Sequence, residues 1–335
     1  MTTTIAGREI NFGLWYDFRN PEPWRRPTSQ VYAETLDHIA YAERLGFDTI
    51  WTSEHHFIDD EYSPSLLPIC AAIAARTRRV RIGTNVLLLP LHDPVRIAED
   101  AATVDAISGG RLDLGVAVGY KREEFTGFGI DRRERAARME EACAVLRKAW
   151  APGAFSFGGK HYQYADINVT PKPTQDPMPL WIGGFSEPAV RRAARLGDGL
   201  VAAANVIPVF LDEWRKQERT GEPKIALTLP WAFIADDPEE AWREIAPHIL
   251  HQNQNYARWF TAAGMALFPS IPASAEEIRA RNPNVVVSTE QARSIIERVV
   301  RDVPVTHLYW WAIPPGMAPK AAYRSIEAFS RAVLA

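Results

Sequence analysis

The stretch VRIGTNVLLLPLHDPVRIAEDAATVDAISGGRLDLGVAV, residues 80–118, contains a complete strand–helix–strand unit. Residues 80–89 are rich in β-branched and aliphatic side chains, which predicts a buried strand. A helix follows, opened by Asp93-Pro94 as N-cap and first-turn proline and closed at Ser108-Gly109-Gly110. Residues 112–118 then form a second apolar run. Two strands joined by a helix predict neighbouring parallel strands.

The same alternation extends along the chain on both sides of this stretch. Further strands are expected to begin near residues 10, 47, 180, 199, 225 and 305, and further helices over 29–45, 64–76, 131–150, 187–196, 208–217, 238–251, 289–300 and 320–333. Eight βα units predict an α/β fold of the (β/α)8, or TIM-barrel, type. An open doubly wound sheet is the alternative, which the absence of a G-x-G-x-x-G sequence after the first strand weakens.

The composition is that of a globular protein, with 335 residues, 47% of them hydrophobic and 24% charged. It excludes a disordered chain, and a net charge of −3 does not favour a nucleic-acid partner. The apolar runs are far shorter than the roughly 20 residues that span a bilayer, so no membrane partner is expected. The start MTTTIAGREINFG lacks a signal-peptide pattern. Cys70 and Cys143 are expected to be buried thiols, which is consistent with a cytoplasmic protein.

Two segments interrupt the alternation within what we expect to be a single domain, 1–335. Residues 151–178 are rich in aromatic residues, proline and glycine, and predict a small hairpin with a loop. Residues 252–287 precede the last unit and predict an insertion that forms a lid or binding loop.

The sequence Glu54-His55-His56 stands at the end of the second predicted strand, where barrel enzymes carry their active sites. A histidine beside a carboxylate can act as an acid or base near neutral pH. The alternative is that one histidine packs and the other is solvated. A metal site, as in a metal-dependent hydrolase barrel, is a further alternative, since Asp59, Asp60 and Glu61 follow. The sequence disfavours it, and no metal is predicted, because adjacent strand residues point to opposite faces and no H-x-H or H-E-x-x-H occurs.

The turn Gly183-Gly184-Phe185-Ser186 connects the fifth predicted strand to the helix that follows it. Amides at a helix N-terminus bind anions, and glycines allow the backbone to approach a phosphate. The alternative is a tight turn in which Ser186 only caps its helix. The loop that contains Tyr120 after the fourth strand is either functional or a solvated charged loop, and the basic run over 76–81 predicts a solvated face at the other end of the barrel.

Many aromatic side chains fall near strand ends or in the 252–287 segment. They are Trp15, Tyr16, Trp231, Trp259, Phe260, Tyr309, Trp310 and Trp311. Some are ordinary core residues, and the others can line an apolar pocket for a planar cofactor or a substrate. We therefore expect an apolar or cyclic small-molecule substrate.

Three stretches taken together resemble the bacterial luciferase-like family of flavin-dependent monooxygenases and oxidoreductases. They are GFDTIWTSEHHF (46–57), the segment 81–125 and PLWIGGFSEPAVRRAARLGDG (179–199). The resemblance implies a TIM barrel with an insertion before the last strand.

The resemblance also implies roles for individual residues. His55 corresponds to the functional histidine of the second strand, with Glu54 beside it to orient it. Ser186 corresponds to the phosphate-binding serine, with the amides of Gly184 and Phe185 nearby. A non-prolyl cis peptide bond beneath the flavin ring falls at Asn85-Val86.

The fourth strand departs from the luciferase pattern, because Val118 stands where luciferase has a phosphate-binding arginine. In this region the resemblance therefore implies a phosphate contact only for the backbone of Tyr120. Light emission from a long-chain aldehyde is not expected.

The activity that the resemblance implies is that of a two-component FMN monooxygenase. It would use O2 and reduced FMN supplied by a separate flavin reductase, with His55 as the acid or base. The first alternative is an oxidoreductase that transfers hydride with a deazaflavin coenzyme. The second is a flavin-binding subunit without activity, against which the presence of His55 and Glu54 argues. A homodimer is also expected, paired through helices 64–75 and 94–107.

Overall fold

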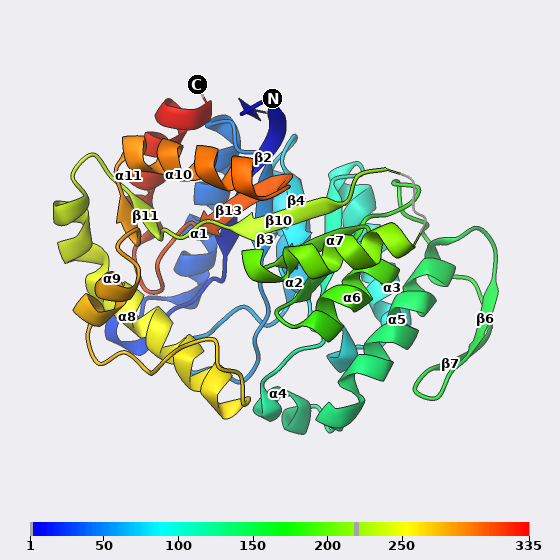
Figure 1. Ribbon diagram of the computed structural model, residues 1–335. Helices are drawn as coiled ribbons and strands as arrows, with labels where there is room; N and C mark the ends of the chain where they lie inside the picture. The colour runs from blue at the N-terminus through cyan, green and yellow to red at the C-terminus, as the bar shows by residue number, and fades with distance from the viewer. Residues whose placement is uncertain (1–2, 218–220, 335) are drawn as a thin grey trace. The chain divides into compact units, whose positions relative to one another are not determined.

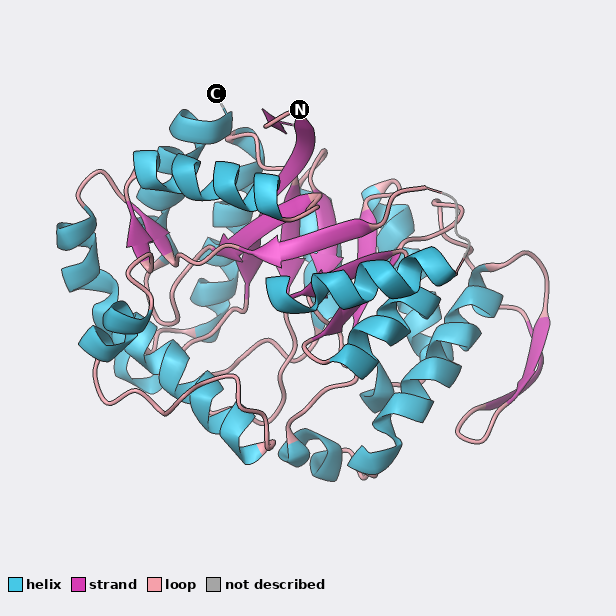
Figure 2. Ribbon diagram, in the orientation of Figure 1, coloured by secondary structure: helices cyan, strands magenta, loops and turns pink. Residues whose placement is uncertain are grey.

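The computed structural model describes residues 3–217 and 221–334, and the chain divides into two compact units. The first unit consists of residues 1–51, 55–64 and 227–335, and the second of residues 52–54 and 65–226. In Figures 1 and 2 the strands of each unit are accompanied by helices. The units are described separately below.

The elements of the first unit come from both ends of the chain. They are β1 (Thr3–Ile5), β2 (Arg8–Tyr16), η1 (Glu22–Trp24), α1 (Thr28–Arg44), most of β3 (Thr49–Thr52), β11 (Phe233–Ile234), α8 (Pro238–Ala262), α9 (Ala275–Arg281), β12 (Val286–Val287), α10 (Thr289–Asp302), β13 (His307–Trp311), α11 (Pro319–Phe329) and η5 (Ser330–Leu334).

The elements of the second unit follow one another along the middle of the chain. They are α2 (Leu66–Arg76), β4 (Arg81–Thr84), η2 (Leu89–Leu91), α3 (Pro94–Ser108), β5 (Leu112–Val116), α4 (Arg122–Gly127), η3 (Arg132–Glu134), α5 (Arg135–Trp150), β6 (Phe155–Gly158), β7 (Gln163–Ile167), β8 (Leu180–Gly184), α6 (Glu187–Leu196), β9 (Gly199–Ala202), η4 (Ala204–Val206), α7 (Ile207–Lys216) and most of β10 (Lys224–Thr228).

Parallel pairing organises the second unit. Strands β4, β5, β8, β9 and β10 pair in that order, each parallel to the next. The helix between β4 and β5 begins as its sequence predicts, because the Asp93 carboxylate accepts hydrogen bonds from the amides of Val95 and Arg96. It ends at Gly109, whose φ of +69° suits glycine.

The first unit has an aromatic core behind its strands. β13 pairs parallel to β2, and β1 folds back antiparallel on β2. The aromatic side chains Phe12, Phe47, Trp310 and Phe329 form four contacting pairs, with ring centroids 4.6–5.6 Å apart. These side chains are essentially inaccessible to solvent, so burial of aromatic surface contributes strongly to this unit.

The eight predicted strands are all present, as β2, β3, β4, β5, β8, β9, β10 and β13. The predicted hairpin within 151–178 is also confirmed, as the antiparallel pair β6–β7. The expectation of an irregular insertion over 252–287 is wrong in part. Residues 252–262 continue helix α8, 275–281 form α9, and β12 pairs with β11. The polar sequence QNQN at 252–255 concealed this helix, because amides are weaker helix formers than alanine.

Both cysteines are buried thiols, as expected. Burial raises the pKa of Cys70 and that of Cys143 to about 12, so neither is a reactive thiolate near neutral pH. Within the described residues, no helix combines the length and the apolarity needed to cross a bilayer.

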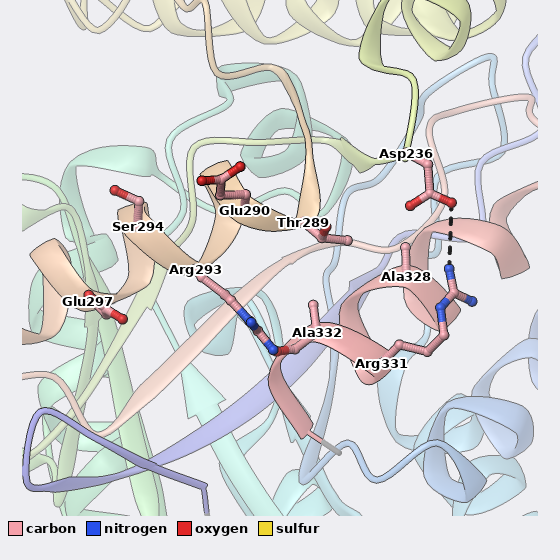
Figure 3. Close-up of a pocket in the computed structure, with 9 residues that line it drawn as sticks. All are labelled: Asp236, Thr289, Glu290, Arg293, Ser294, Glu297, Ala328, Arg331 and Ala332. Carbon is pink, nitrogen blue, oxygen red and sulfur yellow. Dashed lines mark hydrogen bonds and ion pairs between the residues drawn. The ribbon is translucent and has the colours of Figure 1, made fainter.

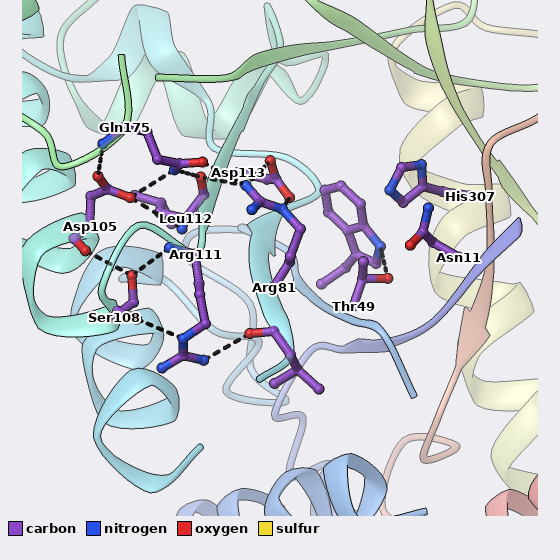
Figure 4. Close-up of polar contacts among 12 residues, drawn as sticks. Asn11, Thr49, Arg81, Asp105, Ser108, Arg111, Leu112, Asp113, Gln175 and His307 are labelled. Carbon is purple, nitrogen blue, oxygen red and sulfur yellow. Dashed lines mark hydrogen bonds and ion pairs between the residues drawn. The ribbon is translucent and has the colours of Figure 1, made fainter. Parts of the chain in front are cut away.

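A polar network anchors the start of β4 to β5, which corrects the expectation that the basic run over 76–81 is only a solvated face. Arg81 donates to both carboxylate oxygens of Asp113, at 2.6 and 2.7 Å, and to Gln175 at 3.0 Å (Figure 4). Gln175 in turn donates to Asp105, which also accepts the Thr174 amide. Asp113 is 1% exposed, so its charge depends on this guanidinium.

We expect Arg81→Ala to lower the free energy of unfolding by about 2 kcal/mol, because the buried Asp113 loses its partner. The value is below that of a fully buried pair because the Arg81 side chain is 33% exposed. Chemical denaturation of the purified protein measures the change. The exposed Arg298 in α10 provides the control, since Arg298→Ala should change stability by less than about 0.5 kcal/mol. Equal effects of the two substitutions would contradict the assignment.

Candidate functional site

The segment after β4 contains the backbone feature that the sequence predicts. The Asn85–Val86 peptide bond is cis. The Asn85 amide donates to the Thr52 carbonyl at 2.6 Å, and the Leu87 amide donates to the Gly115 carbonyl at 2.8 Å. The side-chain nitrogen of Asn85 is buried and has no hydrogen-bond partner in the structure.

Glycines at the end of β8 make room beside this segment. A Cβ atom added at Gly183 would lie 2.9 Å from Val86 Cγ1 and 3.5 Å from the Ala117 Cβ. A Cβ atom added at Gly184 would lie 2.5 Å from the Ala189 Cβ. Both distances to the nearest atom are too short for a real Cβ contact, so this surface requires glycine at both positions.

Ser186 is the N-cap residue of α6, but its side chain makes no capping hydrogen bond. The amides of Ala189 and Val190 donate to the Ser186 carbonyl instead. Ser186 and the preceding Phe185 are exposed. The alternative in which the Ser186 hydroxyl only caps the helix is therefore wrong, and the hydroxyl lies on a helix N-terminus with an anion-binding polarity.

Tyr120 is half-buried in the turn between β5 and α4. Gly119 precedes it with a φ of +73°, and Lys121 follows it as the N-cap of α4. The sequence predicts a loop here, whereas residues 122–127 are helical.

The carboxylate of Glu54 binds the segment that follows the cis peptide bond. One oxygen accepts the Leu88 amide at 2.9 Å, and the other contacts His92 Nε2 at 2.8 Å. Glu54 is 3% exposed. The sequence predicts that Glu54 orients His55, and these two contacts give it a positioning role toward Leu88 and His92.

The Glu54 contact also changes the acidity of His92. Burial lowers the pKa of His92, but the hydrogen bond and the negative charge of Glu54 more than offset burial. The pKa of His92 therefore lies above its ordinary value, and the pair is strongest when the imidazole is protonated.

In the first unit, His55 is surrounded by aromatic rings. The His55 amide donates to the Ser63 carbonyl at 3.3 Å, and His55 is 5% exposed. Its ring centroid lies 4.8 Å from that of Tyr62, 5.0 Å from that of Trp259 and 6.3 Å from that of Tyr256. Helix α8 supplies Tyr256 and Trp259, so part of the predicted lid segment packs against the predicted acid or base.

A buried ionic group lies beside these rings. Arg19 donates to Asp60 Oδ2 at 2.8 Å, and His251 Nε2 lies 3.0 Å from the same oxygen. The Arg19 guanidinium lies 5.4 Å from the ring centroid of Tyr62 and 5.7 Å from that of Trp259, within range of a cation–π contact.

Sequence reasoning did not identify this ionic group. Arg19 and Asp60 are 41 residues apart in the sequence, and Asp60 and His251 are 191 residues apart. His251, Asn255 and Trp259 are spaced four residues apart, which places them on one face of helix α8. This spacing predicts their proximity only if residues 252–262 are helical.

The other predicted aromatic residues divide between core and site. Trp310 is buried in the core and lies 5.8 Å from Trp231, ring to ring. Trp15 stacks on Trp311 at 3.8 Å, and Trp311 lies 5.6 Å from Tyr256.

A hollow of about 510 Å³ lies in the first unit, and none of the predicted site residues lines it (Figure 3). Its lining comes from α10, from the C-terminal helix and from Asp236, which pairs with Arg331 at 3.8 Å. It is open and lined by surface ion pairs, without a histidine or a buried acid, so it is not a candidate active site.

The family described as luciferase-like monooxygenase matches residues 10–292 of this chain. The oxygenase component of the flavin-dependent trigonelline monooxygenase of Acinetobacter baylyi is 28% identical over 299 residues, which cover 81% of this chain and 79% of that protein.

Other relatives match over shorter lengths. The F420-dependent glucose-6-phosphate dehydrogenase of Amycolatopsis mediterranei is 31% identical over 178 residues, which cover 51% of this chain and 53% of that protein. The uncharacterized protein y4vJ of Sinorhizobium fredii is 32% identical over 182 residues, which cover 54% of this chain and 52% of that protein. The chain thus spans about half the length of these two relatives.

Solved structures share the fold. The monooxygenase RslO1 from Streptomyces bottropensis has a TM-score of 0.82 and 23% identity, covering 97% of this chain and 99% of its own. The oxygenating constituent of 3,6-diketocamphane monooxygenase from Pseudomonas putida, in complex with FMN, has a TM-score of 0.77 and 19% identity, covering 99% and 98%. The predicted α/β TIM-barrel fold is therefore confirmed.

We expect Glu54→Gln to lower the pKa of His92 toward its ordinary value of about 6.5, because the negative charge is removed. The raised pKa means that the pair stabilises the fold fully below pH about 6.5, and that this contribution is lost as pH rises through the folded-state pKa. Histidine NMR titration measures the pKa, and denaturation at several pH values measures the stability. The exposed Glu123 is the control, and an unchanged His92 pKa in Glu54→Gln would refute the pairing.

Proposed function

Because the chain belongs to the luciferase-like monooxygenase family, we propose that it is the oxygenase component of a two-component FMN monooxygenase. In this proposal a separate reductase supplies reduced FMN, and O2 and a small organic substrate are the other reactants. The observation that carries the proposal is the β8–α6 turn, where the Ser186 hydroxyl stays outside the helix cap beside two obligatory glycines.

The second unit has the chemistry to hold a flavin phosphate and ring. Ser186 and the amides of Gly184 and Phe185 would bind the phosphate at the N-terminus of α6. The backbone of Tyr120 is a further candidate for that contact. Asn85 and Val86 would back the ring, and the buried Asn85 nitrogen without a partner provides a donor for a ring acceptor. When bound, FMN supplies oxygen activation, which no amino-acid side chain provides.

In the first unit, His55 would be the acid or base of the proposed reaction. His55 is enclosed by Tyr62, Tyr256 and Trp259, and an imidazole in such a site can hold or release a proton at its ring nitrogen. The segment 252–287 would act as a lid. In the second unit, Glu54 would fix the backbone after β4 through Leu88.

Hydride transfer with the deazaflavin F420 is the second candidate function, because F420-dependent dehydrogenases are among the relatives. We favour FMN because the trigonelline monooxygenase component matches over most of both chains, whereas that F420 enzyme matches over about half. We also propose that the protein is cytoplasmic and forms a homodimer through α2 and α3.

We expect Ser186→Ala to weaken binding of FMN about tenfold, because a hydrogen bond to a charged phosphate contributes about 1.5 kcal/mol or more. Titration followed by flavin fluorescence measures the change. Ser65 is the matched control, because it is also an exposed N-cap serine without a capping hydrogen bond. Equal weakening by Ser65→Ala, or none by Ser186→Ala, would remove Ser186 from the phosphate site.

The choice between FMN and F420 rests on an anaerobic experiment. The protein is mixed with reduced FMN, oxygen is admitted, and flavin absorbance is recorded over time, with a parallel titration of F420. We expect reduced FMN to bind and to be reoxidised more slowly than free reduced FMN. The opposite outcome is weak binding of reduced FMN, reoxidation at the rate of free reduced FMN, and tight binding of F420. It would favour hydride transfer with F420 instead.

His55→Ala is examined in the same experiment. It should still bind reduced FMN, because the proposed phosphate contacts are elsewhere. With a substrate in hand, product formed per flavin oxidised should fall by about a hundredfold, the usual lower bound for loss of a general acid or base.

A further inference from the structure

Several buried side-chain atoms of the first unit have no hydrogen-bond partner, and three of them belong to one ionic group. These three are Asp17 Oδ2, Arg19 Nη1 and Asp60 Oδ1. Their residues are 4%, 4% and 5% exposed, respectively. Buried polar atoms are nearly always hydrogen-bonded, so three orphans in one group indicate a ligand that completes them.

The three residues form one connected group. The Arg19 amide donates to Asp17 Oδ1 at 3.4 Å, and the Arg19 side chain donates to Asp60. Asp17 and Arg19 also line a cavity of about 20 Å³ together with Arg26, Thr35 and mainly apolar residues, several of them in the loop after β13. The charge of Arg26 is paired with Glu34. The volume of the cavity accommodates about one water molecule or one ammonium group.

The charges of the group do not balance. Two carboxylates face one guanidinium, and His251 adds a hydrogen bond only at Asp60. Burial raises the pKa of Asp17, the charge of Arg19 lowers it and the charge of Asp60 raises it, with the result at about 6. The amide of Arg19 and the side chain of Trp311 also lower the pKa of Asp17, as hydrogen-bond donors. Asp17 is therefore a carboxylate near neutral pH whose charge is only partly compensated by a guanidinium that it shares with Asp60.

Aromatic rings lie near the carboxylates of Asp17 and Asp60. Burial raises the pKa of Tyr256, Arg19 lowers it, and Asp17 and Asp60 raise it, which places the phenol within the field of the group. The Tyr256 ring lies 5.6 Å from that of Trp311 and 5.1 Å from that of Trp259. Aromatic faces together with a carboxylate are the usual means of binding an organic cation.

We propose that Asp17, Arg19 and Asp60 recognise a cationic nitrogen on the organic substrate. The nitrogen donates to Asp17 Oδ2, the aromatic rings contact the cyclic part of the molecule, and Arg19 Nη1 donates to an oxygen substituent. As a statement about the substrate this rests on the proposed function, and it revises the expectation of a merely apolar or cyclic molecule.

The test uses the full chain without flavin, so it does not depend on the oxygenase reaction. Benzylammonium and benzyl alcohol are the probes, because they have similar shapes and differ in charge. Their binding is measured at pH 8 by calorimetry and by tryptophan fluorescence. We expect benzylammonium to bind at least about tenfold more tightly, and Asp17→Asn to abolish this preference.

Asp236→Asn provides the control, because it is the same isosteric change at an exposed aspartate of the same unit. It should leave the preference unchanged. Circular dichroism and thermal unfolding establish that Asp17→Asn is folded, which is expected because the variant removes a buried uncompensated charge.

A second measurement needs no variant. Affinity for benzylammonium should fall as pH drops below about 6, where Asp17 becomes protonated, while affinity for benzyl alcohol stays constant. The charged and titratable groups that face Asp17 are Arg19, Asp60 and Tyr256, with Arg26 lining the same cavity. The Trp311 side chain also acts on Asp17, and His251 acts on it through Asp60.

Several outcomes would overturn the proposal. Equal binding of the two probes, or a preference that survives in Asp17→Asn, would exclude recognition of a cation by Asp17. Absence of binding by both probes would assign the cavity to a buried water. A protein that binds benzylammonium as expected but fails the FMN experiment would retain this site and lose the oxygenase assignment.

Discussion

The carboxylate of Glu54 is the contact on which the geometry of the second unit's site depends. It accepts the Leu88 amide and contacts His92, so it links the loop after β3 to the segment after β4. That segment also contains the cis Asn85–Val86 bond. A buried carboxylate with one backbone and one side-chain partner is strongly directional, because both of its oxygens are used. Displacing either partner would weaken the hydrogen bonding of a buried charge.

The glycines at the end of β8 also shape the site of the second unit. Gly183 leaves space for Val86, and Gly184 leaves space for the first turn of α6. The backbone of β8 can therefore pass directly into a helix whose N-terminus carries an exposed, uncommitted serine hydroxyl. Packing, and not a particular side-chain charge, thus forms the proposed phosphate site, which is consistent with the loss of the luciferase arginine at Val118.

The strands and most helices could be predicted because each carries a local signal. Asp93-Pro94 and Gly109 mark the ends of α3, and the alternation of apolar runs gives the parallel strands. The cis bond and the site positions came from motif resemblance, because no local pattern specifies them. The C-terminal part of α8 was missed because its stability comes from packing of Tyr256 and Trp259 against Tyr62 and His55. Tertiary packing of this kind overrides weak helix propensity.

The ionic group in the first unit was beyond sequence reasoning for a related reason. Asp17 and Arg19 follow a strand, Asp60 lies in a loop and His251 lies in a helix, so only folding brings them together. Once together, they differ from the Glu54 contact in one essential respect. Glu54 has both oxygens satisfied within the protein, whereas Asp17, Arg19 and Asp60 each retain a buried atom without a partner. A satisfied carboxylate stabilises a backbone, and an unsatisfied group is maintained at a cost in stability that binding of a complementary molecule can offset.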